Sequence, residues 1–284
     1  MQTPSFDSLP TENTYVLNAE SAAEMHRLIR QDSYLTKEAG GLFPERSDLS
    51  AIHDILDVAC GPAGWALDFA YAHSQIHITG VDISKKMINY ANVRKLPNTT
   101  FHVMNVLHGL DFPDASFDLV NARLIFSFMP PTAWPALIQE CLRVTRPGGL
   151  IRLTEWEYPF TNAPACEKMN GLFTQALQRV GQSFSPDGRH LCITPMLESF
   201  VQDAGYKNVQ PRAFASNFSW GSDAYETVRE INETGYLLIQ PFLLKMGLTT
   251  EEELSQLYQQ GLQEMRSSSF RGIVFYLTVL GEKL

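Results

Sequence analysis

One loop in the sequence has a composition that suits close contact with a ligand. It reads Asp57-Val-Ala-Cys-Gly-Pro-Ala-Gly64, and it continues the apolar run that begins at Ile55. Small residues let a backbone approach a ligand closely, and the helix predicted to begin at Trp65 presents free backbone N–H groups to the same place. Asp57 adds a negative charge just before the loop. The pattern therefore predicts a binding loop between a buried strand and a helix.

A second carboxylate follows at the end of the next predicted strand. Gly80-Val-Asp82 closes the apolar segment 76–83. A carboxylate at this position can accept hydrogen bonds from both hydroxyls of a ribose, and ligands of parallel sheets bind at the carboxyl ends of the strands. The spacing of Asp57 and Asp82 therefore implies a cofactor that contains a nucleoside.

Two nucleoside cofactors compete for this loop. Ala59-x-Gly61-x-x-Gly64 is one substitution away from the dinucleotide fingerprint G-x-G-x-x-G. However, Asp57 would face the pyrophosphate of NAD, which is an unfavourable contact between anions. S-adenosylmethionine carries an ammonium and a sulfonium group and no phosphate, so it suits Asp57 better. An NAD-dependent oxidoreductase remains the alternative.

The elements that position these residues alternate along the chain. Apolar runs predict buried strands, and capping signals or helical spacing predict the helices between them. Near-continuous apolar strands separated by helices are typical of a parallel sheet covered on both faces. We expect strands at 55–59, 76–83, 101–106, 117–125, 150–156, 209–219 and 270–280. We expect helices at 21–37, 65–73, from 84, at 132–144 and 163–180, from 194, and two within 222–266, with a turn at 146–149.

Four motifs carry a resemblance to a known family. ILDVACGPAGWALDFA, GVDIS, LDFPDASFDLV and RVTRPGGLIRL occur in this order. Together they resemble class I S-adenosylmethionine-dependent methyltransferases of the small-molecule type, over about residues 50–157. The resemblance implies an α/β, Rossmann-like fold with a seven-stranded, mostly parallel sheet, helices on both faces and an antiparallel last strand.

The resemblance also suggests a division of the chain. Residues 1–40 would form an N-terminal arm and lid helix, and residues 41–157 the cofactor-binding core. Residues 158–284 would complete the sheet and carry helical substrate-cap insertions at about 160–192 and 220–267.

Carried onto this chain, the family's cofactor-binding positions fall on several short segments. Asp57 and the loop would hold the methionine part, Asp82 the ribose, and the residues after Asp82 the adenine. Alanine at two loop positions where the family has glycine makes a positive φ unexpected there. The expected cofactor-binding residues are Tyr15, Asp57, Ala59, Gly61, Gly64, Asp82, Ile83, Met87, Asn105, Val106 and Asn121. Of these, Tyr15 is expected to close as a lid residue, Asn105 to accept from the adenine amino group and Asn121 to face the sulfonium.

The acceptor would lie beyond the fourth and fifth strands. Glu155 and Glu157 fall on one side of a strand, and Glu155 is our candidate for a general base or an orienting group. Both could instead be solvated edge carboxylates. Arg123 could pair with a carboxylate or hold an anionic substrate. The expected substrate-binding residues are Arg123, Phe126, Trp156 and Tyr158.

Composition limits the function further. The 284 residues carry a formal charge of −9, and nucleic-acid binding needs a basic face. Aromatic inserted segments suit a small apolar acceptor. No signal peptide or membrane span is evident, and the four cysteines are far apart. We therefore expect a cytoplasmic enzyme of specialised metabolism that uses S-adenosylmethionine, releases S-adenosylhomocysteine and needs no metal. A homo-oligomer and a non-catalytic S-adenosylmethionine-binding protein both remain open.

Overall fold

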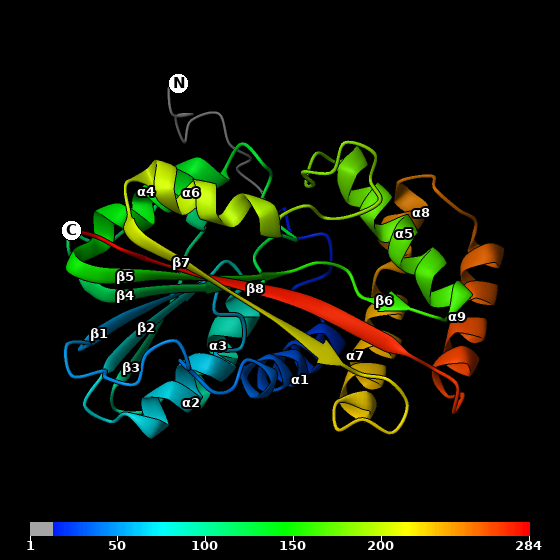
Figure 1. The fold of residues 1–284 in the computed structure, drawn as a ribbon, viewed down its shortest axis with the longest axis horizontal. Coiled ribbons are helices and arrows are strands. Elements are labelled where there is room, and N and C mark those ends of the chain that lie inside the picture. The colour runs from blue at the N-terminus through cyan, green and yellow to red at the C-terminus, as the bar shows by residue number, and fades with distance from the viewer. Residues whose placement is uncertain (1–13) are drawn as a thin grey trace.

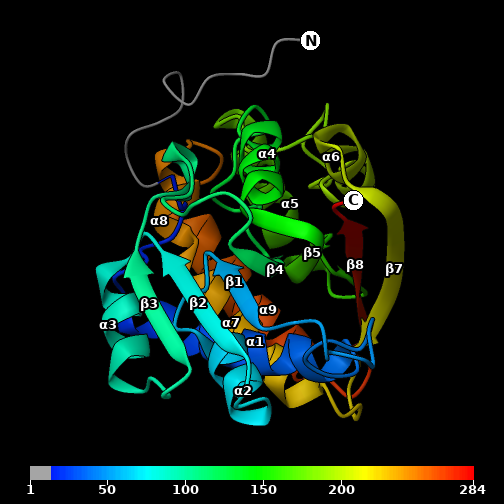
Figure 2. The same cartoon turned by 90° about the vertical axis from the view of Figure 1, so that its left-hand side faces the viewer.

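A computed structural model describes residues 14–284, which form a twisted sheet with helices on both faces (Figures 1 and 2). The strand order is β3-β2-β1-β4-β5-β8, with β7 and the short β6 also paired to β8. Strands β1 to β5 are parallel, and β8 is antiparallel to β5, β6 and β7. The strands are β1 Asp54–Val58, β2 His77–Asp82, β3 Thr99–Val103, β4 Phe117–Arg123, β5 Thr145–Trp156, β6 Phe160–Thr161, β7 Lys207–Asn217 and β8 Gly272–Glu282.

This arrangement confirms the predicted α/β fold class with an antiparallel last strand. The sheet has eight strands where seven were expected, because the two-residue β6 pairs with the beginning of β8. The central strands are buried along nearly their whole length, and this burial explains why they read as continuous apolar runs.

The helices form two groups. Helices α1 to α3 cover one face of the sheet and α4 and α6 cover the other, whereas α5, α7, α8 and α9 gather beyond the ends of the parallel strands (Figures 1 and 2). The α-helices are α1 Ala22–Glu38, α2 Gly64–Ala72, α3 Lys85–Val93, α4 Trp134–Val144, α5 Pro164–Arg179, α6 Leu197–Ala204, α7 Tyr225–Leu238, α8 Gln240–Lys245 and α9 Glu251–Met265. Two short 3-10 helices are η2 Val106–His108 and η3 Thr194–Met196.

Local signals account for the helix beginnings. The Ser21 side chain accepts from the Glu24 N–H, and the Ser84 hydroxyl accepts from the Met87 N–H, so both predicted caps are confirmed. Three helices occupy 225–265 instead of the predicted two. Pro241 lies in the first turn of α8, since proline fits the first turn of a helix but not its interior.

The predicted turn at 146–149 is also different in the structure. Strand β5 already begins at Thr145, and its pairing with β4 shifts in register between Phe117 and Leu119. Gly148 has a φ of +78° within this irregular segment. The Arg-Pro-Gly-Gly sequence therefore marks a distortion inside the strand.

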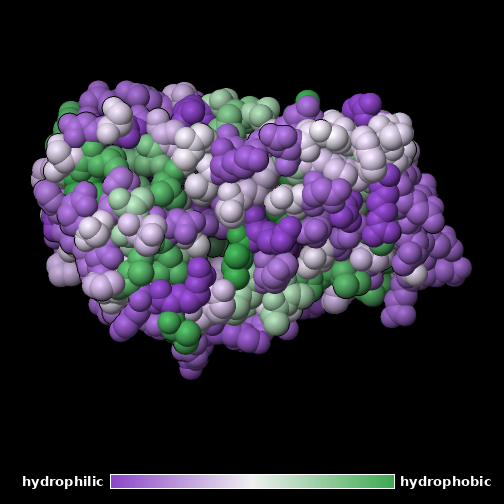
Figure 3. Space-filling model, turned by 90° about the horizontal axis from the view of Figure 1, so that it is seen from below, coloured by the Kyte–Doolittle hydropathy of each residue, from purple (hydrophilic) through white to green (hydrophobic). Residues whose placement is uncertain are grey.

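The surface seen from below in Figure 3 is largely hydrophilic, with hydrophobic patches and a small hollow near its middle. Within residues 14–284, no helix is long and apolar enough to cross a membrane.

Candidate active site

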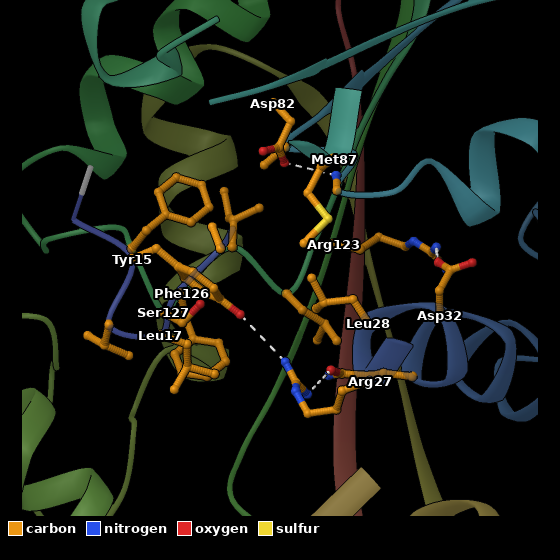
Figure 4. A pocket seen from close by; sticks show the side chains of 18 of the residues that line it. Tyr15, Leu17, Arg27, Leu28, Asp32, Asp82, Met87, Arg123, Phe126 and Ser127 are labelled. Carbon is orange, nitrogen blue, oxygen red and sulfur yellow. Dashed lines mark hydrogen bonds and ion pairs between the residues drawn. The ribbon is translucent and has the colours of Figure 1, made fainter. Parts of the chain in front are cut away.

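A large cavity lies at the carboxyl ends of β1, β2 and β4, and Figure 4 shows its interior. Residues from α1, α5, α7 and the segment 14–19 close it. Fourteen of the sequence-predicted site residues line it: Tyr15, Asp57, Ala59, Gly61, Gly64, Asp82, Ile83, Met87, Asn105, Val106, Arg123, Phe126, Trp156 and Tyr158. The other two, Asn121 and Glu155, do not.

The loop after β1 has a left-handed backbone at three places. The φ angles are +55° at Ala59, +54° at Gly61 and +61° at Ala63, so the expectation of ordinary φ at the two alanines was wrong. An L-residue in this region costs about 1–2 kcal/mol. Hydrogen bonds to β2 offset this cost: the Cys60 N–H donates to the Val81 carbonyl over 2.9 Å. The loop is therefore fixed by its neighbour strand, which the local sequence does not reveal.

Asp82 joins this loop to the beginning of α3. Its Oδ2 accepts from the Gly61 N–H and its Oδ1 from the Ser84 N–H, each over 2.9 Å. Burial raises the pKa of the Asp82 carboxyl, and the two backbone donors and Glu20 modify that effect in opposite directions. Each carboxylate oxygen keeps a lone pair that can accept from a ligand hydroxyl.

Asp57 lies deeper, at the end of β1. Its Oδ1 accepts from the Asn121 side-chain amide over 2.7 Å, and only 5% of the residue is exposed. Burial raises the pKa of the Asp57 carboxyl to about 7, against the opposing effects of Arg123, Asn121 and Arg152. The carboxyl can therefore change its charge near neutral pH.

Asn121 does not face the cavity as expected. It is fully buried in β4, where it lies between Asp57 on β1 and Arg152 on β5. Its amide groups hydrogen-bond to both neighbours, so it reaches a ligand only through Asp57.

Glu155, our candidate for a general base, does not line the cavity. It is buried, and its Oε1 accepts from the Ile125 N–H over 2.7 Å, because the chain after β4 turns back over the end of β5. Burial raises the pKa of this carboxyl well above its usual range. In Glu157 both carboxylate oxygens accept hydrogen bonds, from the N–H groups of Leu191, Cys192 and Thr194. The role of Glu155 as a general base stays a prediction.

Arg123 is held by α1. Its guanidinium forms an ion pair with Asp32 and donates to the Thr36 hydroxyl over 3.2 Å (Figure 4). It also lies 5.5 Å from the ring centre of Trp65, which is itself a core residue. The ion pair ties α1 to the end of β4 and forms part of the cavity wall.

The cavity has an apolar end beside Asp82. Ile83, Met87, Met104, Val106 and Leu107 line it there. Asn105 begins η2, and its side-chain oxygen accepts from the Leu107 N–H over 3.1 Å. One acceptor position of this oxygen is thus already used, and one is left.

Aromatic rings form a wall farther from the loop. The ring centres of Phe126 and Trp156 are 6.3 Å apart, those of Trp156 and Tyr158 5.5 Å, and those of Tyr158 and Phe173 5.4 Å. The indole N–H of Trp156 is buried without a hydrogen-bond partner in the described part of the chain. Aromatic rings thus line this half of the cavity, and polar side chains such as Gln31, Asn170 and Asn232 also reach the cavity.

Sequence reasoning missed the polar residues that α1 contributes. Arg27 donates to both oxygens of the fully buried Glu24 over 2.7 Å and also contacts Gln31. The Tyr15 hydroxyl donates to the same carboxylate over 2.5 Å. Arg27 and Gln31 lie one helical turn apart, beside Leu28 of the apolar stripe. This spacing could have indicated that the two polar side chains share the buried side of α1. Among residues 14–284, no group of His, Cys, Asp or Glu side chains could hold a metal ion.

Comparison with known proteins agrees with this geometry. Residues 55–149 match the family described as methyltransferase domain. A probable methyltransferase, ltbC of Aspergillus luteorubrus, is 33% identical over 107 residues, 34% of this chain and 38% of that protein. The 27-O-demethylrifamycin SV methyltransferase of Amycolatopsis mediterranei is 33% identical over 127 residues, 43% of this chain and 44% of that protein. The matched region thus spans less than half of each relative.

Solved structures show the same fold. Phosphoethanolamine N-methyltransferase 2 of Haemonchus contortus, in complex with S-adenosyl-L-methionine, aligns with a TM-score of 0.56 at 17% identity, over 93% of this chain and 57% of that one. The YcgJ protein of Bacillus subtilis aligns with a TM-score of 0.51 at 15% identity, over 82% and 92%.

The strand order gives the chain the fold of these solved structures. The segment that matches the methyltransferase domain family, residues 55–149, contains the loop after β1 and Asp82.

Proposed function

We propose that this chain transfers the methyl group of S-adenosylmethionine to a small apolar or aromatic metabolite and releases S-adenosylhomocysteine. The observation that carries the proposal is the division of one cavity into two parts. Carboxylates and an apolar cleft lie beside the loop after β1, and an aromatic wall lies beyond them. A nucleoside cofactor and an acceptor could therefore meet inside a shared enclosure.

The residues fit the cofactor. The free oxygen of Asp57 suits an ammonium group, and Asp82 retains acceptor capacity for two ribose hydroxyls. The apolar residues around Met87 suit the adenine ring. The pyrophosphate of NAD would instead meet the Asp57 carboxylate, so the geometry favours S-adenosylmethionine over NAD.

The cofactor supplies an electrophilic methyl group bonded to a positively charged sulfur. During transfer, the acceptor forms a bond to the methyl carbon while the carbon–sulfur bond breaks, and the electron pair stays on sulfur. The protein would act mainly by alignment and exclusion of water. Phe126 and Trp156 would orient a flat acceptor, and α1, held by the ion pair between Arg123 and Asp32, would close the cavity.

Relatives support an aromatic acceptor. The demethylmenaquinone methyltransferase of Geobacillus stearothermophilus is 32% identical over 109 residues, 37% of this chain and 45% of that protein. Its name indicates a quinone-related substrate. The ring-lined half of this cavity has the chemistry to receive a ring of that kind.

The test is transfer of an isotope-labelled methyl group from S-adenosylmethionine to a panel of quinols, phenols, indoles and terpenoids, read by mass spectrometry. We expect a labelled product heavier by one methylene group, and we expect its formation to stop in an Asp82→Ala variant. Binding of S-adenosylhomocysteine without transfer to the panel or to any acceptor in a cell extract would instead establish the non-catalytic alternative.

A further inference from the structure

A row of polar side chains crosses the sheet directly beneath the cofactor loop. Asp57, Asn121 and Arg152 are register partners on the adjacent strands β1, β4 and β5. All three are at least 95% buried, with exposed fractions of 5%, 0% and 1%. Arginine is almost never buried to this extent without a partner. The row therefore needs an explanation beyond core packing.

The hydrogen bonds in the row have a fixed direction. Arg152 has only donors, so the oxygen of the Asn121 amide must face it, and Nη1 lies 3.2 Å from that oxygen. The Asn121 NH₂ group must then face Asp57, to which it donates over 2.7 Å. The bond occupies Oδ1 of Asp57 and leaves Oδ2 for another donor. The arginine thus sets the orientation of the amide, and the amide sets that of the carboxylate.

The far end of the row is anchored outside the sheet. Arg152 donates through Nε and Nη2 to the two oxygens of Glu45, over 3.1 and 3.3 Å. Its guanidinium also lies 5.6 Å from the ring centre of Phe43. Glu45 is itself only 8% exposed and has a second, weaker partner in Arg212 at 3.6 Å. The loop after α1 is therefore connected to the cofactor side of the sheet.

We propose that Asn121 and Arg152 are positioning residues for the cofactor: the row holds Asp57 as an oriented carboxylate with one oxygen available for the ammonium group of S-adenosylmethionine. The proposal rests on the proposed function. Neither residue touches the cavity, so each acts only through Asp57.

The electrostatic surroundings agree with this role. Asp57 faces Arg123 and Asn121 on β4, Arg152 on β5 and Asp32 on α1, with Cys60 beside it on the loop. Burial opposes ionisation of Asp57, and the two arginines favour it. Removing Arg152 takes away one of these two charges as well as the orientation of Asn121. The Asp57 carboxyl should then hold its proton to a higher pH.

The first experiment measures Asp57 in the protein without cofactor. The side-chain carboxyl carbon of Asp57 is titrated by NMR, with Asp57→Asn used for assignment. We expect the pKa of Asp57 to rise by about one unit or more in Arg152→Met and in Asn121→Leu. Thr154→Val is the matched control. Thr154 lies on β5 like Arg152, and the substitution removes a buried hydrogen bond of 2.9 Å to Thr278 on β8 without touching the row. It should leave the Asp57 titration unchanged.

Arg152→Met leaves Glu45 buried without its main partner and could fail to fold. The double variant Glu45→Gln/Arg152→Met removes both charges, so it keeps the test available. An Asp57 pKa that is equal in the wild type and in every folded variant would overturn the proposal.

The second experiment measures the affinity for S-adenosylhomocysteine, which keeps the ammonium group, by calorimetry between pH 6 and 9. Compared with the wild type, we expect the variants of the row to bind about tenfold more weakly at pH 6 and within about threefold at pH 9. A loss of affinity that is uniform over this range would contradict the role in ionising Asp57. No binding by the wild type at any pH would refute the proposed function itself, and the positioning role with it.

Discussion

Replacing Asp82 with alanine should weaken cofactor binding and should also lower the free energy of unfolding. In the structure, the Asp82 carboxylate accepts from the backbone N–H groups of Gly61 and Ser84, both over 2.9 Å. It also lines the cavity where a ribose would lie. The substitution therefore removes two bonds that are present in the free protein and two that would form only with the cofactor.

The size of both effects follows from the strength of hydrogen bonds to the charged Asp82 carboxylate. Each contributes about 1.5–3 kcal/mol, less what water restores. Two ribose bonds give a net loss of about 3 kcal/mol in binding, or roughly 100-fold in Kd. The two loop bonds are partly accessible to water, so the free energy of unfolding should fall by about 2–3 kcal/mol.

Asp118→Ala is the matched control. The Asp118 carboxylate also accepts from two backbone N–H groups, those of His53 and Asp54, over 2.8 and 2.9 Å. Asp118 lies at the opposite, amino ends of β1 and β4 and also pairs with Arg146 over 2.9 Å. Asp118→Ala should therefore lose at least as much stability as Asp82→Ala and keep full affinity for S-adenosylhomocysteine.

Calorimetric titration of both variants with S-adenosylhomocysteine, together with urea denaturation, separates the two effects. Equal losses of affinity in Asp82→Ala and Asp118→Ala would show that the effect is one of general stability. Wild-type affinity in a folded Asp82→Ala variant would show that the ribose is held elsewhere.

Three further predictions concern neighbouring residues. First, the pKa of Asp57 is raised from 3.8 to about 7 in the folded protein, so protonation of Asp57 stabilises the fold. This stabilisation is roughly 4 kcal/mol at low pH, and it is lost as the pH rises from about 4 to 7. Asp57→Asn should therefore gain stability relative to the wild type on going from pH 5 to pH 8 in urea denaturation, and a constant difference would contradict the raised pKa. Second, a Cβ at Gly64 would overlap the Asp32 carboxylate, so Gly64→Ala should disturb the pair with Arg123 and cost about 1–3 kcal/mol. Gly171→Ala, in the interior of α5 with open space around it, should instead stabilise the protein by about 0.5–1 kcal/mol, and denaturation curves that rank the two variants the other way would contradict this account. Third, Phe173→Ala should lower kcat/KM for the acceptor at least tenfold, while the Kd of S-adenosylhomocysteine stays within threefold. These factors correspond to free-energy changes of about 1.4 and 0.7 kcal/mol. An equal loss of kcat/KM and of affinity for S-adenosylhomocysteine would place Phe173 in the cofactor half of the cavity.

The sequence predicts the sheet well because its signals are local. Continuous apolar runs locate β1 and β4, and the serines at 21 and 84 locate the beginnings of α1 and α3. The loop after β1 and Asp82 also follow from spacing alone, since the carboxyl ends of neighbouring parallel strands lie together.

The remaining site residues depend on contacts between distant segments. One oxygen of Glu155 accepts from the backbone N–H of Ile125, and Arg27 enters the cavity only because α1 packs across the strand ends. The positive φ of Ala59 and Ala63 opposes the local preference of alanine and is stabilised by the bonds of the loop to β2. Such long-range partners leave no mark in the spacing of residue types.

The most direct test of the central claim is a pair of calorimetric titrations of the wild-type protein at pH 8, one with S-adenosylhomocysteine and one with NAD. The geometry of Asp57 and Asp82 predicts saturable heat with a stoichiometry of one S-adenosylhomocysteine per chain, and no saturable heat with NAD. Saturable binding of NAD together with no heat from S-adenosylhomocysteine would contradict the claim.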